Sequence, residues 1–353
     1  MNVYSNAFNF SAHLNGQVDP RTGQYGCQVR LTTLYPKGPV EASRDINLSF
    51  SMYNPRNDGY GIGWRLSNTE FDLNTRRLTL LTGEQFQTHG MPSVGGVMAL
   101  KDRKLKDLVV KRPDVDSLHV IYKDGTVEVL RRQNSLRPYI ISTVQFESGE
   151  RVHFRYDPQG ALERIVNQQG EDLLVLHYSG RRLAGVEARI EGGRFARTWF
   201  EQFNEQLVRV DVAHAPMGPG VPGSYVFEYE ALRSGLVAIR RVKSPMGGDE
   251  RIDYEENGHQ YRDNTFLPRV KSWTRFPGAG QPSLKRTYRY SASQNFTGYP
   301  FSGGFVDGED NLYLVLGLYD YWTEVRSQEG DDANKVLQVV RTEYNKFHLL
   351  TRE

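Results

Sequence analysis

Carboxylate side chains offer this sequence its most direct route to chemistry. Asp307, Glu309, Asp310 and Asn311 form the densest acidic cluster among the glycine-rich loops. A calcium ion needs several oxygen ligands, and one loop can supply them. The spacing differs from that of an EF-hand, so we expect a solvated acidic turn. If the chain binds a metal, Asp307, Glu309 and Asp310 are the candidate ligands.

A second carboxylate pair, Asp253 and Glu255, would lie on one face of a strand, as the two carboxylates of a glycoside hydrolase can. Alternating charges on an exposed sheet face explain the same pattern without catalysis. The chain has no Gly-x-Ser-x-Gly, His-Glu-x-x-His or Gly-x-x-x-x-Gly-Lys motif. Its 8 histidines show no ligand-like pair, and its one cysteine, Cys27, is expected to be a packed or half-exposed thiol. We therefore expect no enzymatic activity and no cofactor.

The 4 tryptophans suggest a different class of function. Exposed aromatic rings on a sheet can stack on sugar rings, so the candidates for carbohydrate binding are Trp64, Trp199, Trp273 and Trp322. Aromatic side chains are usually buried, and packing within the core or a wall is the competing interpretation.

Charge and hydropathy exclude some partners. The 353 residues carry 44 basic and 42 acidic side chains, and a net charge of +2 is too small to attract nucleic acid. The most apolar run, Leu312 to Tyr319, is far shorter than the ~20 residues of a membrane helix, so we expect no membrane span. Met1 to Phe10 lacks the basic and apolar regions of a secretory signal.

Period-two alternation dominates the elements that must carry these residues. In Asp45 to Tyr53, apolar and polar side chains alternate, which predicts a half-buried strand. Arg151 to Tyr156 has the same pattern, and the turn formed by Asp157, Pro158 and Gly160 follows it. Val336 to Leu350 fits a helix about as well as a strand. The sequence therefore predicts an all-β fold with few helical residues.

A repeat of about one hairpin begins near residue 150. Each unit has an aromatic residue and then a Leu-x-x-Val/Ile ending. The endings are Leu162 to Ile165, Leu183 to Val186, Leu207 to Val210, Leu236 to Ile239 and Leu267 to Val270. The preceding aromatic residues are Tyr156, Tyr178, Phe203, Tyr229 and Tyr254. Because a lone hairpin is only marginally stable, each unit needs its neighbours.

The unit Phe154 to Ile165 contains Tyr-Asp and a glycine before its leucine, and it resembles the YD repeat of Rhs and teneurin-type proteins. Other segments resemble parts of bacterial Rhs proteins or of the B component of Tc toxins. They are Val18 to Tyr25, Asn47 to Asn54, Gly59 to Ser67, Leu78 to Glu84, Tyr122 to Leu130, Asp307 to Tyr313 and Tyr344 to Leu350.

The resemblance implies YD-type hairpins that form a curved, open part of a β-shell. It implies an N-terminal Rhs-type β region over 1–145 and a degenerate YD-repeat segment over 146–353, truncated at its C-terminus. In such proteins the shell encloses a C-terminal toxin, which an aspartyl autoprotease near the shell's end releases. We find neither the autoprotease nor the toxin segment in this sequence.

The function expected from the resemblance is that of a structural shell segment that helps enclose and deliver a toxic cargo. Its partners would be the rest of the shell, the toxin domain, or a secretion or injection apparatus. The chain would be made in the bacterial cytoplasm and exported without a standard signal peptide. The alternative is a carbohydrate- or cell-surface-binding β-protein that acts in adhesion, with a glycan as its partner.

Overall fold

The computed structural model describes residues 5, 16–35, 43–54, 56–102, 107–134, 137–190, 193–212, 223–262, 264–278, 280–301, 304–332 and 334–353. These residues form 25 strands and no helix, which confirms the all-β prediction. No helix that could cross a membrane occurs in this part of the chain. The ambiguous stretch that begins at Val336 is a strand over Val336–Asn345.

The strands follow each other in chain order. The first eleven are β1 (Gln17–Asp19), β2 (Gln24–Leu34), β3 (Arg44–Phe50), β4 (Trp64–Leu66), β5 (Glu70–Asp72), β6 (Arg77–Thr79), β7 (Gln85–Gln87), β8 (Leu108–Lys111), β9 (Ser117–Tyr122), β10 (Val127–Arg132) and β11 (Tyr139–Gln145). The next seven are β12 (Arg151–Tyr156), β13 (Leu162–Asn167), β14 (Asp172–Ser179), β15 (Arg182–Arg189), β16 (Phe195–Phe203), β17 (Gln206–Val212) and β18 (Gly223–Ala231). The last seven are β19 (Val237–Lys243), β20 (Asp249–Arg262), β21 (Thr265–Phe276), β22 (Leu284–Tyr290), β23 (Asp320–Glu329), β24 (Val336–Asn345) and β25 (Leu350–Arg352).

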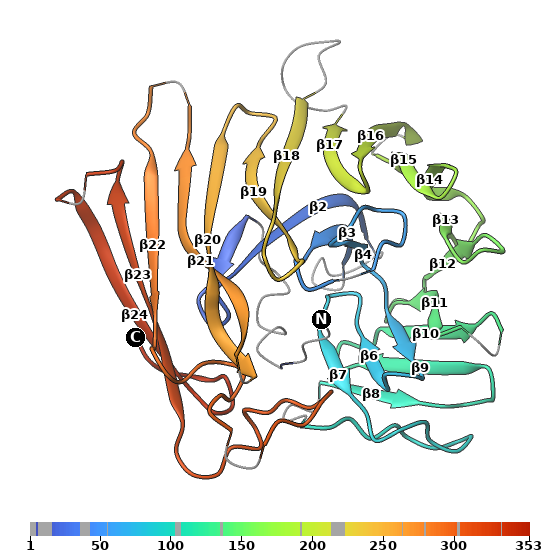
Figure 1. Cartoon of the computed structure of the whole chain (residues 1–353). Helices are drawn as coiled ribbons and strands as arrows, with labels where there is room; N and C mark the ends of the chain where they lie inside the picture. Colours follow the sequence, from blue (N-terminus) through green and yellow to red (C-terminus); the bar gives the residue numbers. More distant parts are fainter. Residues whose placement is uncertain are drawn as a thin grey trace.

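Two sheets organise the molecule. Strands β1 to β4 form a small antiparallel sheet, which we call the N-terminal sheet. From β11 to β25 each strand pairs antiparallel with the next, and we call this continuous ladder the wall. Figure 1 shows the wall as an arc with the N-terminal sheet inside it. Among the described strands β25 pairs only with β24, so the arc is open and the prediction of a curved, open shell is confirmed.

Strands β5 to β11 form a closed group at the other end of the wall. β11 pairs with β5 as well as with β10 and β12. The bridges Thr88↔Leu100 and Val97↔Lys111 connect β7 to β8 and complete the ring. A separate apolar core fills it, with Phe71, Leu78 and Leu118 among its fully buried members. The sequence predicted a division of the chain into two regions after residue 145. This position falls between β11 and β12, and because these strands pair with each other, one sheet crosses the boundary.

The wall bends at the aromatic residues of the repeat. The strand register shifts at Arg155/Tyr156, His177/Tyr178, Glu228/Tyr229 and Asp253/Tyr254. A β-bulge increases local twist and bends the strand that contains it. Because these bulges recur at equivalent positions in several hairpins of the wall, each contributes a bend to the arc.

The same four tyrosines, and Tyr290 on β22, each connect their own strand to the one before it. Their hydroxyls donate to backbone carbonyls on the preceding strand: Tyr156 to Ile141 (2.7 Å), Tyr178 to Leu162 (3.0 Å), Tyr229 to Leu207 (2.6 Å), Tyr254 to Ile239 (2.8 Å) and Tyr290 to Val270 (2.8 Å). We call this set the tyrosine ladder. Phe203, the repeat's one phenylalanine, has no hydroxyl and is exposed. A hydrogen bond of this kind contributes about 0.5–1.5 kcal/mol, so the ladder stabilises the wall collectively.

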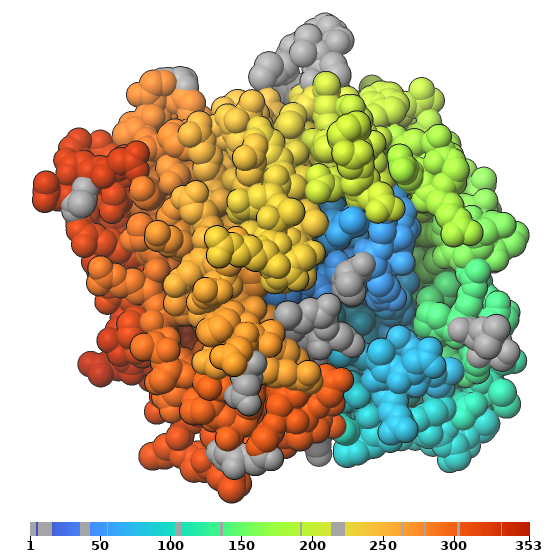
Figure 2. Space-filling model, viewed as in Figure 1, coloured from blue at the N-terminus to red at the C-terminus, as the bar shows by residue number. Residues whose placement is uncertain are grey.

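The Leu-x-x-Val/Ile endings point to the inside of the arc. Leu236 is half-buried and Leu267 belongs to a second core, whereas Leu162, Ile165, Leu207 and Val210 are buried there, as are Leu183, Val186, Ile239 and Val270. They pack in one apolar core with Ile46, Leu48 and Trp64 of the N-terminal sheet. In the space-filling view the N-terminal sheet, in blue, is surrounded by the wall (Figure 2). The concave side of the arc is therefore occupied by the chain's own N-terminal sheet.

Candidate functional site

The contact between the N-terminal sheet and the wall is the candidate functional site, and we call it the seam. Its centre is the segment 57–64, which leads into β4 and touches the turns after β14 and β16. The Leu183 amide donates to the Gly59 carbonyl (2.9 Å), and the Ile62 amide donates to the Glu205 carbonyl (2.7 Å). The Gln202 side chain also donates to the Gly59 carbonyl (2.8 Å). Backbone of one sheet is thus bonded directly to backbone of the other.

Two glycines allow this close approach. Gly59 and Gly61 have φ angles of 96° and 100°, in the region that L side chains rarely adopt. A Cβ on Gly59 would lie 2.2 Å from the Arg181 carbonyl oxygen, and one on Gly61 would lie 2.8 Å from the Leu207 nitrogen. The Gly-x-Gly-x-Gly-Trp element therefore serves close packing of two backbones, and no helix follows it that could bind a phosphate.

Trp64 extends the seam into the tyrosine ladder. Its indole nitrogen donates to the Tyr229 hydroxyl (2.8 Å), which in turn donates to the Leu207 carbonyl. The indole ring packs against Phe50 and Phe227, with centroid distances of 5.6 and 5.1 Å. The N-terminal sheet is thereby bonded to the same hydroxyl that connects two wall strands.

A second contact of this kind joins the tyrosine hydroxyls of the two parts. The Tyr60 hydroxyl lies 3.3 Å from that of Tyr178 in the ladder. Burial raises the pKa of Tyr178 to about 12. Burial also raises the pKa of Tyr60 well above its ordinary value, so both hydroxyls stay protonated at neutral pH and remain able to donate.

The far end of the seam lies at β20 and β21. The Tyr25 hydroxyl donates to Glu250 (2.9 Å), which also accepts from the Trp273 indole (3.2 Å). The Val270 amide donates to the Gly23 carbonyl (2.8 Å). Cys27 is buried beside this group, and burial raises the pKa of its thiol to about 12. Such a thiol is a packed side chain and a poor nucleophile.

The predicted sugar-stacking residues divide into two classes. Trp64 and Trp273 are buried in the apolar core, so for them the expectation of carbohydrate binding is wrong. Trp322 is half-buried, with the Arg341 guanidinium 4.1 Å from its ring centroid. Trp199 alone of the four is largely exposed, at 48%.

The carboxylates of the predicted acidic cluster each contact a different partner. Asp307 lies 3.6 Å from Arg262, and Glu309 forms an ion pair with Lys101. Asp310 is buried next to His348 instead. No group of three potential metal ligands forms in the described parts of the chain, and the three carboxylates face three different partners.

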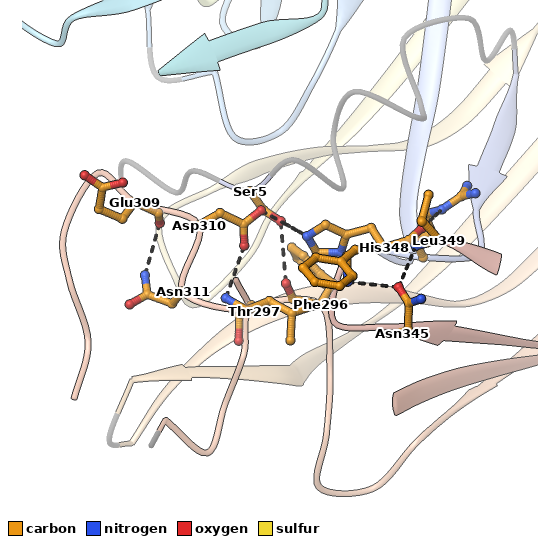
Figure 3. Close-up of polar contacts among 12 residues, drawn as sticks. Ser5, Phe296, Thr297, Glu309, Asp310, Asn311, Asn345, His348 and Leu349 are labelled. Carbon is orange, nitrogen blue, oxygen red and sulfur yellow. Dashed lines mark hydrogen bonds and ion pairs between the residues drawn. The ribbon is translucent and has the colours of Figure 1, made fainter. Parts of the chain in front are cut away.

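Asp310 belongs to a buried polar group around His348 (Figure 3). His348 Nε2 lies 3.0 Å from the Asp310 carboxylate and 3.4 Å from Ser5 Oγ, and Nδ1 lies 3.0 Å from the Tyr321 hydroxyl. Serine, histidine and aspartate are the residues of a hydrolase triad, but there the acid and the nucleophile contact different ring nitrogens. Here both contact Nε2, and the ring is fully buried, so the group joins chain segments and has no access for a substrate.

The other predicted residues lie on the wall. Asp253 and Glu255 both point to solvent from β20, where Asp253 accepts from the Ser272 hydroxyl and Glu255 pairs with Arg269 (2.8 Å). The Asp157 to Gly160 turn joins β12 to β13. In it the Gly160 amide donates to the Asp157 carbonyl (3.0 Å), and Gly160 has a φ of 91°.

Sequence reasoning missed the tyrosine ladder of the wall and the long-range contacts of Trp64 and His348. The tyrosine ladder had a signal in the chain, because tyrosine recurs in four of the five repeat units where phenylalanine would pack equally well. The partners of Trp64 and His348 had none, since Tyr229 is 165 residues from Trp64 and Asp310 is 38 residues from His348.

Comparisons with known proteins give a coarse match. No protein-family model and no curated protein matches the chain. Among solved structures it is similar to the crystal structure of TcdB2-TccC3-Cdc42, with a TM-score of 0.33 and 12% sequence identity over 91% of this chain. It is also similar to TcdB2-TccC3 without its hypervariable C-terminal region, with a TM-score of 0.31 and 11% identity over 92% of this chain. In both cases it spans 19% of the matched chain.

Proposed function

We propose that this protein is a structural wall segment of an Rhs/YD-repeat toxin shell and has no catalytic activity of its own. The observation that supports this role is the continuous ladder from β11 to β25, which curves around the N-terminal sheet (Figure 1) and shares one apolar core with it. A wall of paired strands is a barrier to a polypeptide, because its backbone groups are already bonded to each other.

The space within the chain limits what it can enclose alone. A cleft of about 1100 Å³ lies between the polar face of the N-terminal sheet, at Asn47 and Ser49, and strands β5 to β7, at Asp72 and Arg77. A folded domain of 100 residues has a radius of gyration of about 13 Å and needs a space several times larger. We infer that this chain encloses a toxic cargo only together with a partner polypeptide that supplies further strands of the shell.

The open edge of the wall is the surface proposed to receive those strands. Two exposed apolar residues lie on β24: Leu337, whose side chain is 62% exposed, and Val339. Two more lie at β25: Leu349 directly before it and Leu350 within it. An edge strand with apolar side chains and unpaired backbone groups is a template for another strand. Export from the bacterial cytoplasm without a standard signal peptide, by secretion or injection, belongs to the same proposal.

Light scattering coupled to size-exclusion chromatography tests the role of the edge. The unmodified chain at tens of micromolar should elute above its monomer mass of 40.4 kDa, because its edges pair. Leu337→Lys combined with Leu350→Lys should restore the monomer, since lysines on an edge strand oppose pairing.

Leu318→Lys is the matched control, because Leu318 is 97% exposed but lies outside the edge strands. It should leave the elution unchanged. A clean monomer for the unmodified chain, or an equal effect of the control variant, would contradict the proposed edge. Background rates in a screen of ester, peptide, glycoside and phosphate substrates are expected, and a rate lost in Asp253→Asn or Glu255→Gln would contradict the structural role.

A further inference from the structure

The outer face of the wall has a slot whose two sides are rings. Strands β14, β15 and β16 follow one another in the arc (Figure 1). Their residues His177, Gly185 and Trp199 lie opposite each other in one row across the strands. The inward side chains of the same strands, such as Leu176, Val186 and Phe200, are in the core. The row therefore faces solvent, and its middle position has no side chain.

The missing side chain is what makes the slot. A hollow of about 270 Å³ is lined by His177, Gly185, Glu187, Arg197 and Trp199, together with Val186 and Thr198. Gly185 does not have a positive φ, and a Cβ there would have no atom closer than 3.7 Å. Neither backbone conformation nor close packing requires glycine at this position, in contrast to Gly59 and Gly61.

The width of the slot fits one flat ring. Adjacent strands are about 4.8 Å apart, so His177 and Trp199, which lie on either side of β15, are separated by about 9.6 Å. A ring between them needs a van der Waals contact of about 3.5–4.0 Å on each face. The hollow is also below the ~300–1000 Å³ of sites that take larger ligands, which limits the occupant to about one ring.

The polar groups at one side of the slot are suited to hydroxyls without net charge. Arg197 forms an ion pair with Glu187 (2.8 Å), and His177 Nε2 lies 3.9 Å from the same carboxylate. The positive and negative charges balance, while the guanidinium and carboxylate retain donors and acceptors that point to solvent. A ligand that matches this side is neutral at its edge and rich in hydroxyl groups.

We propose that this slot binds one neutral pyranose ring, with its C–H face stacked on Trp199 and its hydroxyls bonded to Arg197, Glu187 and His177. A pyranose has both an apolar face and a polar edge, as the slot requires. An aromatic side chain of a protein partner would fit between the rings but would leave the charged side without hydrogen bonds, at a cost. The proposal concerns the outer face and does not depend on the shell role of the wall.

Saturation-transfer NMR with the full chain tests the site. The probes are methyl β-D-glucopyranoside, methyl β-D-galactopyranoside and N-acetylglucosamine as neutral sugars, and N-acetylneuraminic acid as the charged comparison. At least one neutral sugar should bind with a millimolar dissociation constant and exceed the charged sugar in affinity. Trp199→Ala and Gly185→Val should each weaken that binding at least tenfold, the first by removing the platform and the second by filling the slot.

Phe203→Ala is the matched control, because Phe203 is 65% exposed on the same strand but does not line the hollow. It should leave sugar binding unchanged, and circular dichroism should show that all three variants fold. The proposal is overturned if no neutral sugar binds, if the charged sugar binds best, or if Phe203→Ala weakens binding as much as Trp199→Ala. Unchanged binding in Gly185→Val would overturn it as well.

Discussion

The wall and the seam are held together over very different distances along the chain. In the wall, each tyrosine of the ladder bonds a carbonyl only 15 to 22 residues earlier. In the seam, Trp64 bonds Tyr229 across 165 residues, and Arg21 donates to the His348 carbonyl across 327 residues. Local contacts repeat, so the loss of one leaves others of the same kind. The contacts of the seam occur once each, and we expect their loss to cost more.

Removal of the Trp64 side chain should have the largest effect. Trp64→Ala deletes a fully buried ring and leaves the Tyr229 hydroxyl without its donor. Such deletions cost about 3–5 kcal/mol because the cavity closes only partly. Urea unfolding measures the change, and Trp199→Ala, which removes an exposed ring from the wall, should change the unfolding free energy by less than 1 kcal/mol. If both variants lose the same free energy of unfolding, the seam contributes no more to stability than the outer face of the wall.

A comparison of Gly59→Ala with Gly149→Ala distinguishes the cost of backbone strain from the cost of a steric clash between the two sheets. Gly59→Ala and Gly149→Ala both place a side chain at positive φ, but a Cβ at Gly149 would meet no atom within 4 Å. Strain alone costs about 1–3 kcal/mol, and Gly59→Ala must also displace the Arg181 carbonyl. We therefore expect Gly59→Ala to lower the midpoint of urea unfolding clearly more than Gly149→Ala. If both variants unfold at the same urea concentration, the two sheets do not approach each other closely at Gly59.

Loss of one hydroxyl from the tyrosine ladder should lower the free energy of unfolding less than Trp64→Ala or Gly59→Ala does in the seam. Tyr254→Phe leaves the buried Ile239 carbonyl without its donor, and we expect a loss of about 1 kcal/mol. Tyr225→Phe is the control, since the Tyr225 hydroxyl has no hydrogen bond within the described chain. It should change the free energy of unfolding by less than 0.5 kcal/mol, roughly the range of neutral substitutions. If Tyr225→Phe lowers the free energy of unfolding as much as Tyr254→Phe does, the hydroxyls of the ladder do not stabilise the wall.

The sequence predicted the parts of the fold that local patterns determine. Alternation in Asp45 to Tyr53 identified a strand whose apolar residues Ile46, Leu48 and Phe50 are buried, and the repeat identified the hairpins of the wall. It could not predict that Trp64 and Trp273 are buried while Trp199 is exposed, because the core they enter exists only after the two sheets have docked. For the same reason Asp310 was counted with its sequence neighbours, although its partner is the distant His348.

A histidine near the end of the seam should make the stability of the fold depend on pH. His259 is buried between Tyr290 and Phe296, with ring centroids 5.0 and 5.3 Å away. Burial, and then the charge of Arg269, hold the pKa of His259 well below its ordinary value. The folded state therefore keeps the ring neutral, while the unfolded chain takes up a proton near pH ~6.5.

The sign of this pH dependence follows from linkage. Stability from His259 is complete above the unfolded pKa and falls as the pH drops below it, by up to about 1.4 kcal/mol per pH unit. Thermal unfolding between pH 7.5 and 5 should show this loss, and His259→Leu should make the curve flatter. An identical slope in the variant would mean that other groups cause the acid sensitivity.

The central claim is that the N-terminal sheet and the wall are one cooperative body, and native-state hydrogen exchange tests it most directly. The amides of Leu183 and Ile62 bond across the seam, while the other amides of the paired strands β14 and β15 serve as the wall set. We predict that both sets exchange with the same opening free energy and respond equally to low concentrations of urea. Faster exchange of the seam amides, with the wall amides still protected, would show that the N-terminal sheet detaches from an independently stable wall and would contradict the account.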